Sequence, residues 1–297
     1  MQLHGVLPPV VTPLDSEERL DEAGLERQLD RLLAAGVHGI YLLGSTGEGP
    51  ALREAERQRS IRRAAQIVNG RVPVVVGCMA SSTARAIDNI GTAEAAGADA
   101  VAVTPPHYYP VSGPAEMLEH YRRCTAATAL PVVIYNIPST TKVMLAPETI
   151  MAIRELPRVA GIKDSSGDLA HVLRVLWLRG DDPGFRLLVG ALPITGPALL
   201  MGADGMVPGP ANLDPGLMVE LYERGRSGDA AGVRALQPRI YSLLRVLEFG
   251  PGVTCLKTAL ELLGVCAAHV TAPFPRMDER ERAGLAAALR EHGLLEA

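Results

Sequence analysis

One lysine stands at the end of an apolar, strand-like run, in the stretch VAGIKDSSG at residues 159–167. The chain has only three lysines among its 29 lysine and arginine residues, so a lysine at this place needs an explanation. One interpretation makes Lys163 a surface amine whose stem packs on the core while its charged end reaches water. The other makes it a desolvated amine, because desolvation lowers the pKa of a lysine and makes it a nucleophile toward carbonyl groups. The stretch by itself leaves both open.

A glycine-rich turn, GSTGEGP at residues 44–50, follows another strand-like run. Its two hydroxyl groups, on Ser45 and Thr46, and its backbone N–H groups, including that of Gly47, could bind a carboxylate or a phosphate. The spacing fits neither the dinucleotide-binding fingerprint nor the P-loop, since no lysine follows the glycines. A tight turn in which Ser45 or Thr46 caps the next helix is the structural alternative, and the turn alone favours it.

Tyrosines follow two further strand-like runs. Tyr135 opens YNIPSTTK (135–142), and we expect its ring to point toward the mouth of a barrel, where a phenol can relay protons. The structural alternative is a core tyrosine with a satisfied hydroxyl. TPPHYYP (104–110) places His107, Tyr108 and Tyr109 between prolines. These rings could contact a ligand or cover a contact between subunits.

Other catalytic chemistries have little support in the sequence. The seven histidines form no H-E-x-x-H or H-x-H group, and no cluster of Asp and Glu follows a strand-like run. The G-x-S-x-G motif of serine hydrolases is absent as well. We therefore expect neither a metal nor a cofactor.

The chain predicts a scaffold that would bring these segments together. Short β-branched runs alternate with amphipathic segments of helical length, which is typical of βαβ units around a parallel sheet. There are eight such runs, and they predict a (β/α)8 TIM barrel, a fold whose active sites lie at the carboxyl ends of the strands. The predicted strands span residues 5–13, 39–44, 72–78, 100–106, 131–138, 159–164, 185–190 and 205–211.

Helical segments alone follow the last predicted strand and its helix. We therefore predict a catalytic barrel over residues 1–225 and an extension of about three helices over residues 226–297, packed on the barrel. A doubly wound sheet is the rival architecture, but no nucleotide fingerprint marks a switch point. Of the other two lysines, Lys142 follows a turn and Lys257 lies in the C-terminal helices, and both are predicted to be at the surface.

Composition narrows the class of protein. The chain is 297 residues long and 47% hydrophobic, which is enough for a sizeable core. A formal charge of −4 with mixed signs leaves no basic stripe for nucleic acid, and no apolar run approaches the ~20 residues that span a bilayer. The four cysteines lack C-x-x-C spacing, and the N-terminus has no basic leader. We expect a reduced, cytoplasmic protein that binds neither nucleic acid nor membrane.

The order of the motifs resembles one enzyme family. GSTGEG, YNIP, GIKDSSGD and CLKTALELLG occur with the order and spacing of the dihydrodipicolinate synthase and N-acetylneuraminate lyase family, over essentially the whole chain. The resemblance implies a metal-independent class I aldolase, in which a lysine forms a Schiff base with pyruvate or another 2-oxo acid. It also implies a homotetramer built as a dimer of dimers.

The resemblance also implies roles for individual residues. Lys163 matches the imine-forming lysine, and Tyr135 matches the tyrosine that shuttles protons to and from the imine. Ser45 matches the hydroxyl that links this tyrosine to the proton relay. Thr46 and Gly47 resemble the part of the turn that binds the carboxylate of the 2-oxo acid.

Three further assignments come from the same resemblance. Gly190 and Val207 match positions whose backbone lines the floor of the pocket. His107 and Tyr108 fall on a pair of aromatic positions from which one residue reaches into the neighbouring subunit's site. The resemblance does not decide which of the two completes the relay.

Departures from the family bear on the substrate. Dihydrodipicolinate synthases carry an arginine after YN-x-P for the second substrate's carboxylate, but this chain has Thr140, and a hydroxyl does not replace a guanidinium. Sialic-acid lyases carry acidic groups after strand seven, where this chain has Gly190-Ala191-Leu192-Pro193. The GEGPAL continuation resembles 2-keto-3-deoxy sugar-acid aldolases, for which Thr140 or Thr141 could bind a short hydroxylated chain.

The sequence favours a Schiff-base lyase that cleaves or forms a C–C bond next to pyruvate, on a short 2-keto-3-deoxy sugar acid or a similar 2-oxo acid. The enzyme alternatives are dihydrodipicolinate synthase proper and a family dehydratase or deaminase that acts on a 2-keto-3-deoxy acid. The non-enzyme alternative is a catalytically silent relative that only binds a 2-oxo acid.

Overall fold

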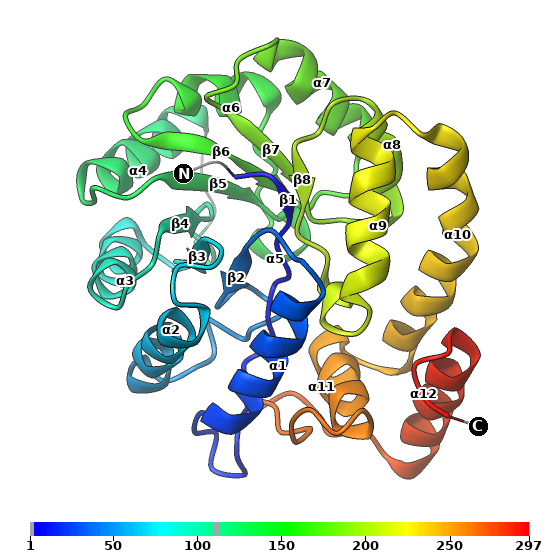
Figure 1. Cartoon of the computed structure of the whole chain (residues 1–297). Coiled ribbons are helices and arrows are strands. Elements are labelled where there is room, and N and C mark those ends of the chain that lie inside the picture. The colour runs from blue at the N-terminus through cyan, green and yellow to red at the C-terminus, as the bar shows by residue number, and fades with distance from the viewer. Residues whose placement is uncertain (1–2, 110–112, 297) are drawn as a thin grey trace.

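The computed structural model describes residues 3–109 and 113–296, so Pro110, the last residue of TPPHYYP, and the terminal residues of the two predicted segments lie outside the description. The described residues form a parallel sheet in the order β1-β8-β7-β6-β5-β4-β3-β2, which curls round with helices on its outside (Figure 1). The strands are β1 (Gly5–Val6), β2 (Ile40–Leu42), β3 (Val74–Gly77), β4 (Ala100–Val103), β5 (Val132–Asn136), β6 (Val159–Asp164), β7 (Arg186–Val189) and β8 (Gly205–Met206). The predicted barrel is confirmed.

The first predicted strand is much shorter than expected. Residues 5–13 were predicted, but regular pairing ends at Val6, because Pro8 and Pro9 have no N–H groups for a ladder. A bridge between Pro9 and Tyr41, together with the hydrogen bond from the Val10 N–H to the Tyr41 carbonyl at 2.9 Å, joins this segment to β2. The last strand likewise ends at Met206 rather than at residue 211.

Helices separate the strands as the pattern predicts. They are α1 (Glu22–Ala34), α2 (Glu54–Val68), α3 (Thr83–Ala95), α4 (Pro114–Ala126), α5 (Pro138–Thr141), α6 (Pro147–Arg154), α7 (Leu169–Arg179), α8 (Leu192–Leu200) and α9 (Pro215–Arg226). No helix of the described residues is both long and apolar enough to cross a membrane.

Strand residues alternate between two apolar layers. Ile40, Leu42 and their counterparts in other strands pack outward against the helices in the large core cluster. The inward positions form a smaller cluster inside the barrel, which includes Tyr41, Val133 and Tyr135. Since side chains of a strand alternate with a period of two, Lys163, opposite Tyr135 in the register of β5 and β6, shares this inner face.

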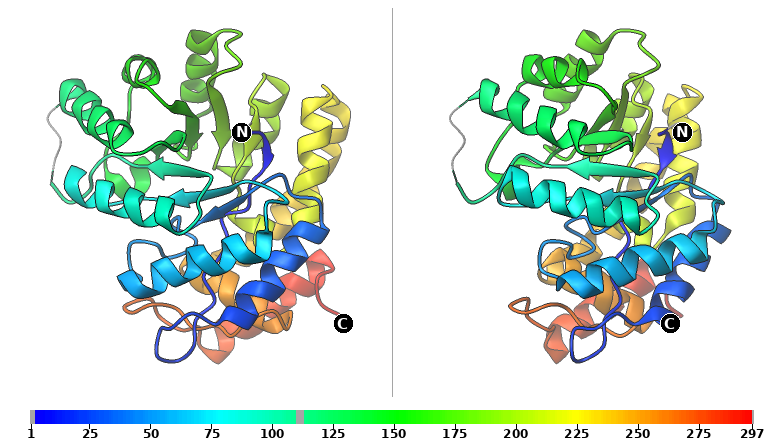
Figure 2. Two further views of the ribbon diagram at one scale, coloured as in Figure 1. Left: turned by 60° about the vertical axis from the view of Figure 1, so that its left-hand side comes forward. Right: turned by 90° about the vertical axis from the view of Figure 1, so that its left-hand side faces the viewer.

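A C-terminal extension of three helices follows α9. These are α10 (Ala230–Arg245), α11 (Gly252–Leu262) and α12 (Glu279–His292), with the short 3₁₀ turn η2 (Val246–Phe249) between α10 and α11. Another 3₁₀ turn, η1 (Gly209–Asn212), lies between β8 and α9. Helix α10 packs on α9 and α8, and α11 packs on η1, so the extension gathers on one side of the barrel, in colours from golden yellow to red in Figure 2.

Lys257 of α11 is not at the surface, and that prediction is wrong. Its amine is buried 2.5 Å from a carboxylate oxygen of Glu48, which is also buried. The amine donates to the His269 carbonyl at 2.7 Å, and the second oxygen of Glu48 accepts from the N–H and hydroxyl of Thr271. The sequence around Lys257 did not indicate this ion pair, because Glu48 lies far away along the chain. The pair ties the extension to the turn that follows β2.

Removing one partner of this pair should destabilise the fold strongly. Lys257→Met leaves the Glu48 carboxylate buried without its cation, and an uncompensated buried charge typically costs about 3–5 kcal/mol. We expect a lower melting temperature for Lys257→Met and for Glu48→Gln, and partial recovery in the double variant. The control is Arg245→Met, which breaks an exposed pair with Glu291 and should cost no more than about 1 kcal/mol. Additive losses in the double variant would contradict the pairing.

Candidate active site

The amine of Lys163 lies inside the barrel between two tyrosine rings. Its Nζ is 3.9 Å from the centre of the Tyr135 ring and 4.1 Å from the centre of the Tyr41 ring, and the rings meet edge to face. The lysine side chain is almost fully buried. Of the two interpretations of VAGIKDSSG, the geometry therefore favours the desolvated amine.

Burial sets the charge state of this amine. It lowers the pKa of the Lys163 ammonium from its ordinary value of 10.5, and the Tyr135 hydroxyl opposes the shift only in part. Burial and the neighbouring Tyr135 raise the pKa of the Tyr41 phenol well above its ordinary value, and the Tyr41 hydroxyl has no partner among the described residues. The site thus combines a Lys163 amine that loses its proton more readily than an exposed lysine with a Tyr41 phenol that keeps its proton.

The adjacent aspartate does not neutralise the lysine. Asp164 faces the other side of β6, where its carboxylate accepts from the Asn136 side chain at 2.7 Å and from the N–H and hydroxyl of Ser166. His171 approaches the same carboxylate at 3.3 Å. Asp168 caps α7 by accepting from the His171 N–H. Asp164, Ser166 and Asp168 therefore act as turn formers and as a helix cap.

The glycine-rich turn after β2 is held in a tight conformation. Leu43 and Glu48, at either end of it, have φ angles of +54° and +56°, which non-glycine residues rarely adopt. Gly49 and Gly77 pass so close to the Leu43 carbonyl that a Cβ at Gly77 would lie 2.7 Å from its oxygen. Side chains at these two positions would force the turn open.

Within the described residues, the backbone N–H groups of Thr46 and Gly47 have no hydrogen-bond acceptor. The helix-cap alternative for this turn is wrong, because α2 begins after Arg53, whose side chain makes no capping bond. Ser45 is exposed and Thr46 half-buried. Free N–H groups beside two hydroxyls are suited to a carboxylate.

A cavity of about 390 Å³ lies over this end of the barrel, and Ser45, Thr46 and Gly190 are among the residues that line it. Val207 is not among the residues that line this cavity. It is buried in the inner cluster, and its N–H donates to the Val189 carbonyl. Thr140 is exposed on the short helix α5 and does not line the cavity. The Thr141 hydroxyl is taken up by the Ile137 and Val143 carbonyls.

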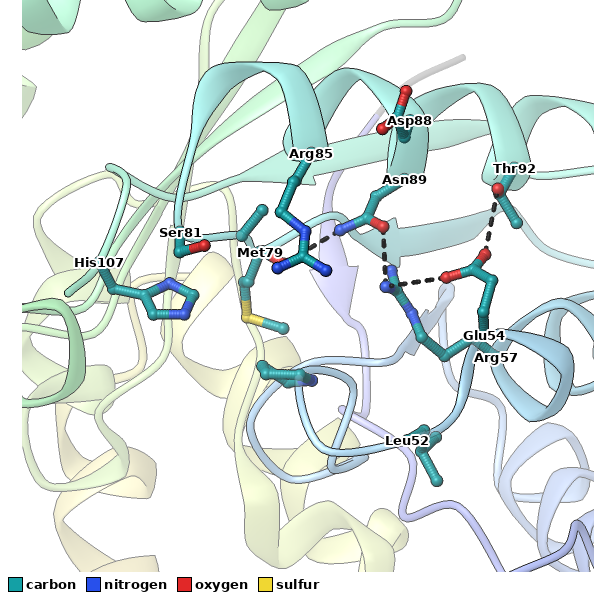
Figure 3. Close-up of a pocket in the computed structure, with 12 residues that line it drawn as sticks. Leu52, Glu54, Arg57, Met79, Ser81, Arg85, Asp88, Asn89, Thr92 and His107 are labelled. Carbon is teal, nitrogen blue, oxygen red and sulfur yellow. Dashed lines mark hydrogen bonds and ion pairs between the residues drawn. The ribbon is translucent and has the colours of Figure 1, made fainter. Parts of the chain in front are cut away.

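Tyr108 and Tyr109 project from the surface. Tyr108 has a φ of +90° and is 84% exposed, and its ring meets that of Tyr109 edge to face. His107 is half-buried at the edge of a different cavity of about 570 Å³ between α2 and α3. There Arg57 donates to Asn89 and pairs with Glu54 (Figure 3). The two candidates for the relay therefore face different surroundings.

The model of the dihydrodipicolinate synthetase family matches residues 2–292. The chain belongs to this family.

Individual relatives match over nearly their whole length. An uncharacterized DapA-like lyase of Halobacterium salinarum is 39% identical over 99% of this chain and 95% of its own. A 4-hydroxy-tetrahydrodipicolinate synthase of Methanoculleus marisnigri is 35% identical over 97% and 99%. The structure of YagE from E. coli K12, a family member in complex with pyruvate, superposes with a TM-score of 0.93 at 30% identity, over 99% of this chain and all of that one. Family members are lyases of the class I aldolase type, and so is this chain.

Sequence reasoning missed Tyr41, the second ring beside Lys163. The signal was available, since Tyr41 alternates with the outward Ile40 and Leu42 of the same strand. It also missed the apolar side chains that the C-terminal helices add to the cavity. No spacing rule relates these helices to the strand ends.

Replacing Lys163 should stabilise the protein while it destroys the site. Lys163→Met removes a buried amine that has no carboxylate partner among the described residues, so we expect the melting temperature to rise by about 2–6 °C, corresponding to about 1–3 kcal/mol. Thermal unfolding measures this shift. Lys142→Met is the matched control, because the Lys142 side chain is exposed and only its amine contacts a carbonyl. An equal shift in both variants would contradict the desolvation argument.

The gain from Lys163→Met should depend on pH. Because burial lowers the Lys163 pKa, the unfolded chain binds more protons than the folded one between the folded pKa and 10.5. The free-energy cost of burying the Lys163 ammonium therefore grows as the pH falls from 10.5, and it reaches its full value below the pKa of the folded state. The difference in melting temperature between the variant and the wild type should shrink as pH approaches 10.5, and a gain that grows with pH would show the opposite sign of shift.

Proposed function

We propose that this chain is a Schiff-base lyase that cleaves, or forms in reverse, the bond between C3 and C4 of a short 2-keto-3-deoxy acid, with pyruvate as the common product. The observation that carries the proposal is the Lys163 amine, desolvated between Tyr135 and Tyr41, in a barrel whose strand β2 leads into a turn with free N–H groups. An amine of lowered pKa is neutral more often at ordinary pH and attacks a ketone.

The chemistry assigns a step to each group. The Lys163 amine adds to the C2 ketone and expels water, which leaves an imine that can accept electrons. Tyr135 removes the proton of the C4 hydroxyl, the C3–C4 bond breaks, and an aldehyde leaves while its bonding electrons form an enamine. Protonation of C3 and hydrolysis of the imine then release pyruvate. The N–H groups of Thr46 and Gly47 hold the substrate carboxylate throughout, and Ser45 relays the proton from Tyr135.

Dihydrodipicolinate synthase activity has weaker support, although several relatives carry that name. Its second substrate brings a carboxylate, and no arginine or lysine is among the residues that line the cavity above the barrel. A dehydratase or deaminase would use the same imine, and product analysis separates it from a lyase. Pyruvate with an aldehyde supports cleavage, whereas a product that keeps the full carbon skeleton excludes it.

The proposal includes a residue from a second subunit. Tyr108 supports it, since its side chain is exposed in a rarely adopted backbone conformation and contacts none of the groups around Lys163 in its own chain. An exposed pair of tyrosines is suited to an interface. We therefore propose a homotetramer in which Tyr108, rather than His107, completes the relay of a partner.

Reduction with borohydride in the presence of pyruvate tests the imine directly. We expect a pyruvyl adduct on Lys163 in the wild type and none in Lys163→Ala. Tyr135→Phe should still give the adduct but lower kcat by about 10²- to 10⁴-fold, the usual contribution of a general acid–base group. Peptide mass spectrometry locates the adduct. An adduct on Lys142 or Lys257, or no adduct at all, would remove the basis of the proposal.

Mixed oligomers test the contribution of Tyr108. Co-expressed subunits that carry Lys163→Ala and Tyr108→Phe should regain activity, because the intact Lys163 sites then receive an intact Tyr108 from their partners. Each parent oligomer should be impaired, and the assay compares kcat of the purified hybrid with both. If Tyr108 acts within its own chain, the hybrid stays as slow as the parents. Full activity of Tyr108→Phe alone would shift the assignment to His107.

A further inference from the structure

The cavity above the barrel has an apolar outer wall. Its lining combines strand ends with α8, α10, α11 and the segments around them, and none of the lining residues carries a charge. Besides three prolines, the apolar side chains are Leu192, Leu244, Leu247, Val253, Leu256 and Phe274. Ser45 and Thr46 carry the only side-chain hydroxyls of the lining, and both lie on the barrel side.

The cavity lies next to the strand that carries Lys163. The N–H of Gly190, one of the lining residues, donates to the carbonyl of Asp164, the residue after Lys163, at 2.6 Å. Leu256 approaches from the other side, because a Cβ on Gly209 would touch both the Thr46 hydroxyl and the Leu256 side chain. A substrate whose carboxylate is bound by the turn at Thr46 therefore has this wall within reach of its other end.

We propose that the cavity binds the part of the substrate beyond C4 and that this part is apolar, a branched alkyl or aryl group, so that the aldehyde released or accepted is hydrophobic. The inference rests on the proposed lyase function. In the cleavage direction a 4-hydroxy-2-oxo acid gives pyruvate and the apolar aldehyde, and no other reactant is consumed.

Two physical effects favour an apolar tail over a sugar chain. Each methylene group that leaves water for an apolar surface raises the affinity about fourfold. Each hydroxyl that loses water without gaining a partner reduces it. The hydroxyls of Ser45 and Thr46 serve the relay and the carboxylate, so a polyhydroxylated tail would meet Leu244, Leu247 and Val253 with its hydroxyls unpaired.

The volume is consistent with one such group. A cavity of about 390 Å³ is within the usual range of small-ligand sites, about 300–1,000 Å³. The cavity between α2 and α3 differs in that charged residues line it. These are Glu54, Arg57, Arg85 and Asp88 (Figure 3). The cavity above the barrel has no group of this kind.

Aldol synthesis from pyruvate and a panel of aldehydes tests the inference in the wild-type enzyme. We expect kcat/KM for isovaleraldehyde and benzaldehyde to exceed that for glyceraldehyde at least about tenfold. Equal values, or a preference for glyceraldehyde, would overturn the apolar assignment. Borohydride trapping of pyruvate on Lys163 is measured in parallel. Trapping without the apolar preference rejects only this inference, whereas absence of trapping rejects the proposed function itself.

Two variants test whether the apolar wall of the cavity causes the preference for an apolar aldehyde. Leu247→Asn and Phe274→Asn should each lower the ratio of kcat/KM for isovaleraldehyde to that for glyceraldehyde by about 5- to 20-fold, since each adds an amide that can pair with a hydroxyl. Phe274 is 40% exposed, so its variant should fold even if Leu247→Asn does not. Met201→Asn, an exposed apolar residue outside the cavity, is the control and should keep the wild-type ratio. An unchanged ratio in Phe274→Asn and Leu247→Asn would contradict the assignment.

Discussion

The removal of one amine from water is the constraint on which the rest of this structure depends. Lys163 serves as a nucleophile only if its pKa falls, and the pKa falls because the barrel interior provides aromatic faces and aliphatic side chains but no carboxylate. Strand alternation makes this possible, since it sends Asp164 to the opposite face of β6. The rings of Tyr41 and Tyr135 offer the ammonium a weak attraction, much less than water would. The fold thus accepts a buried, unneutralised amine in order to have a reactive one.

The turn that faces this amine is fixed from outside the barrel. Residues with left-handed φ angles persist only where the surroundings determine their conformation, and Glu48 is such a residue. Its carboxylate is bound by Lys257 and Thr271, both beyond the last strand. The C-terminal extension is therefore part of the site in two ways, because it supports the glycine-rich turn and provides the apolar wall of the cavity. A barrel without the extension would lack both.

The sequence predicted the parts of the site that depend on local pattern. The alternation of strand-like and helical runs located the strands, and hence placed Tyr135 and Lys163 on consecutive strands of a barrel. Predictions based on one residue at a time were less successful. Lys257 looked like a surface lysine because nothing local marks its contact with Glu48, and two prolines cut short the strand predicted for residues 5–13. The side chains of the cavity wall could not be predicted at all, since their contact with the strand ends arises only from tertiary packing.

Reactivity and substrate preference depend on different parts of this fold. The inward side chains of the strands set the pKa of Lys163, so any change among them alters the reaction itself. The side chains of α10 and α11 line the cavity but are not the rings beside the amine, so we expect their replacement to leave the surroundings of the amine as they are. Substrate preference can therefore change on the C-terminal helices while the imine chemistry stays the same. A shared family chemistry is compatible with different substrates for this physical reason. The proposed choice of aldehyde accordingly rests on the charge-free wall of this chain, and not on the lysine proposed to form the imine.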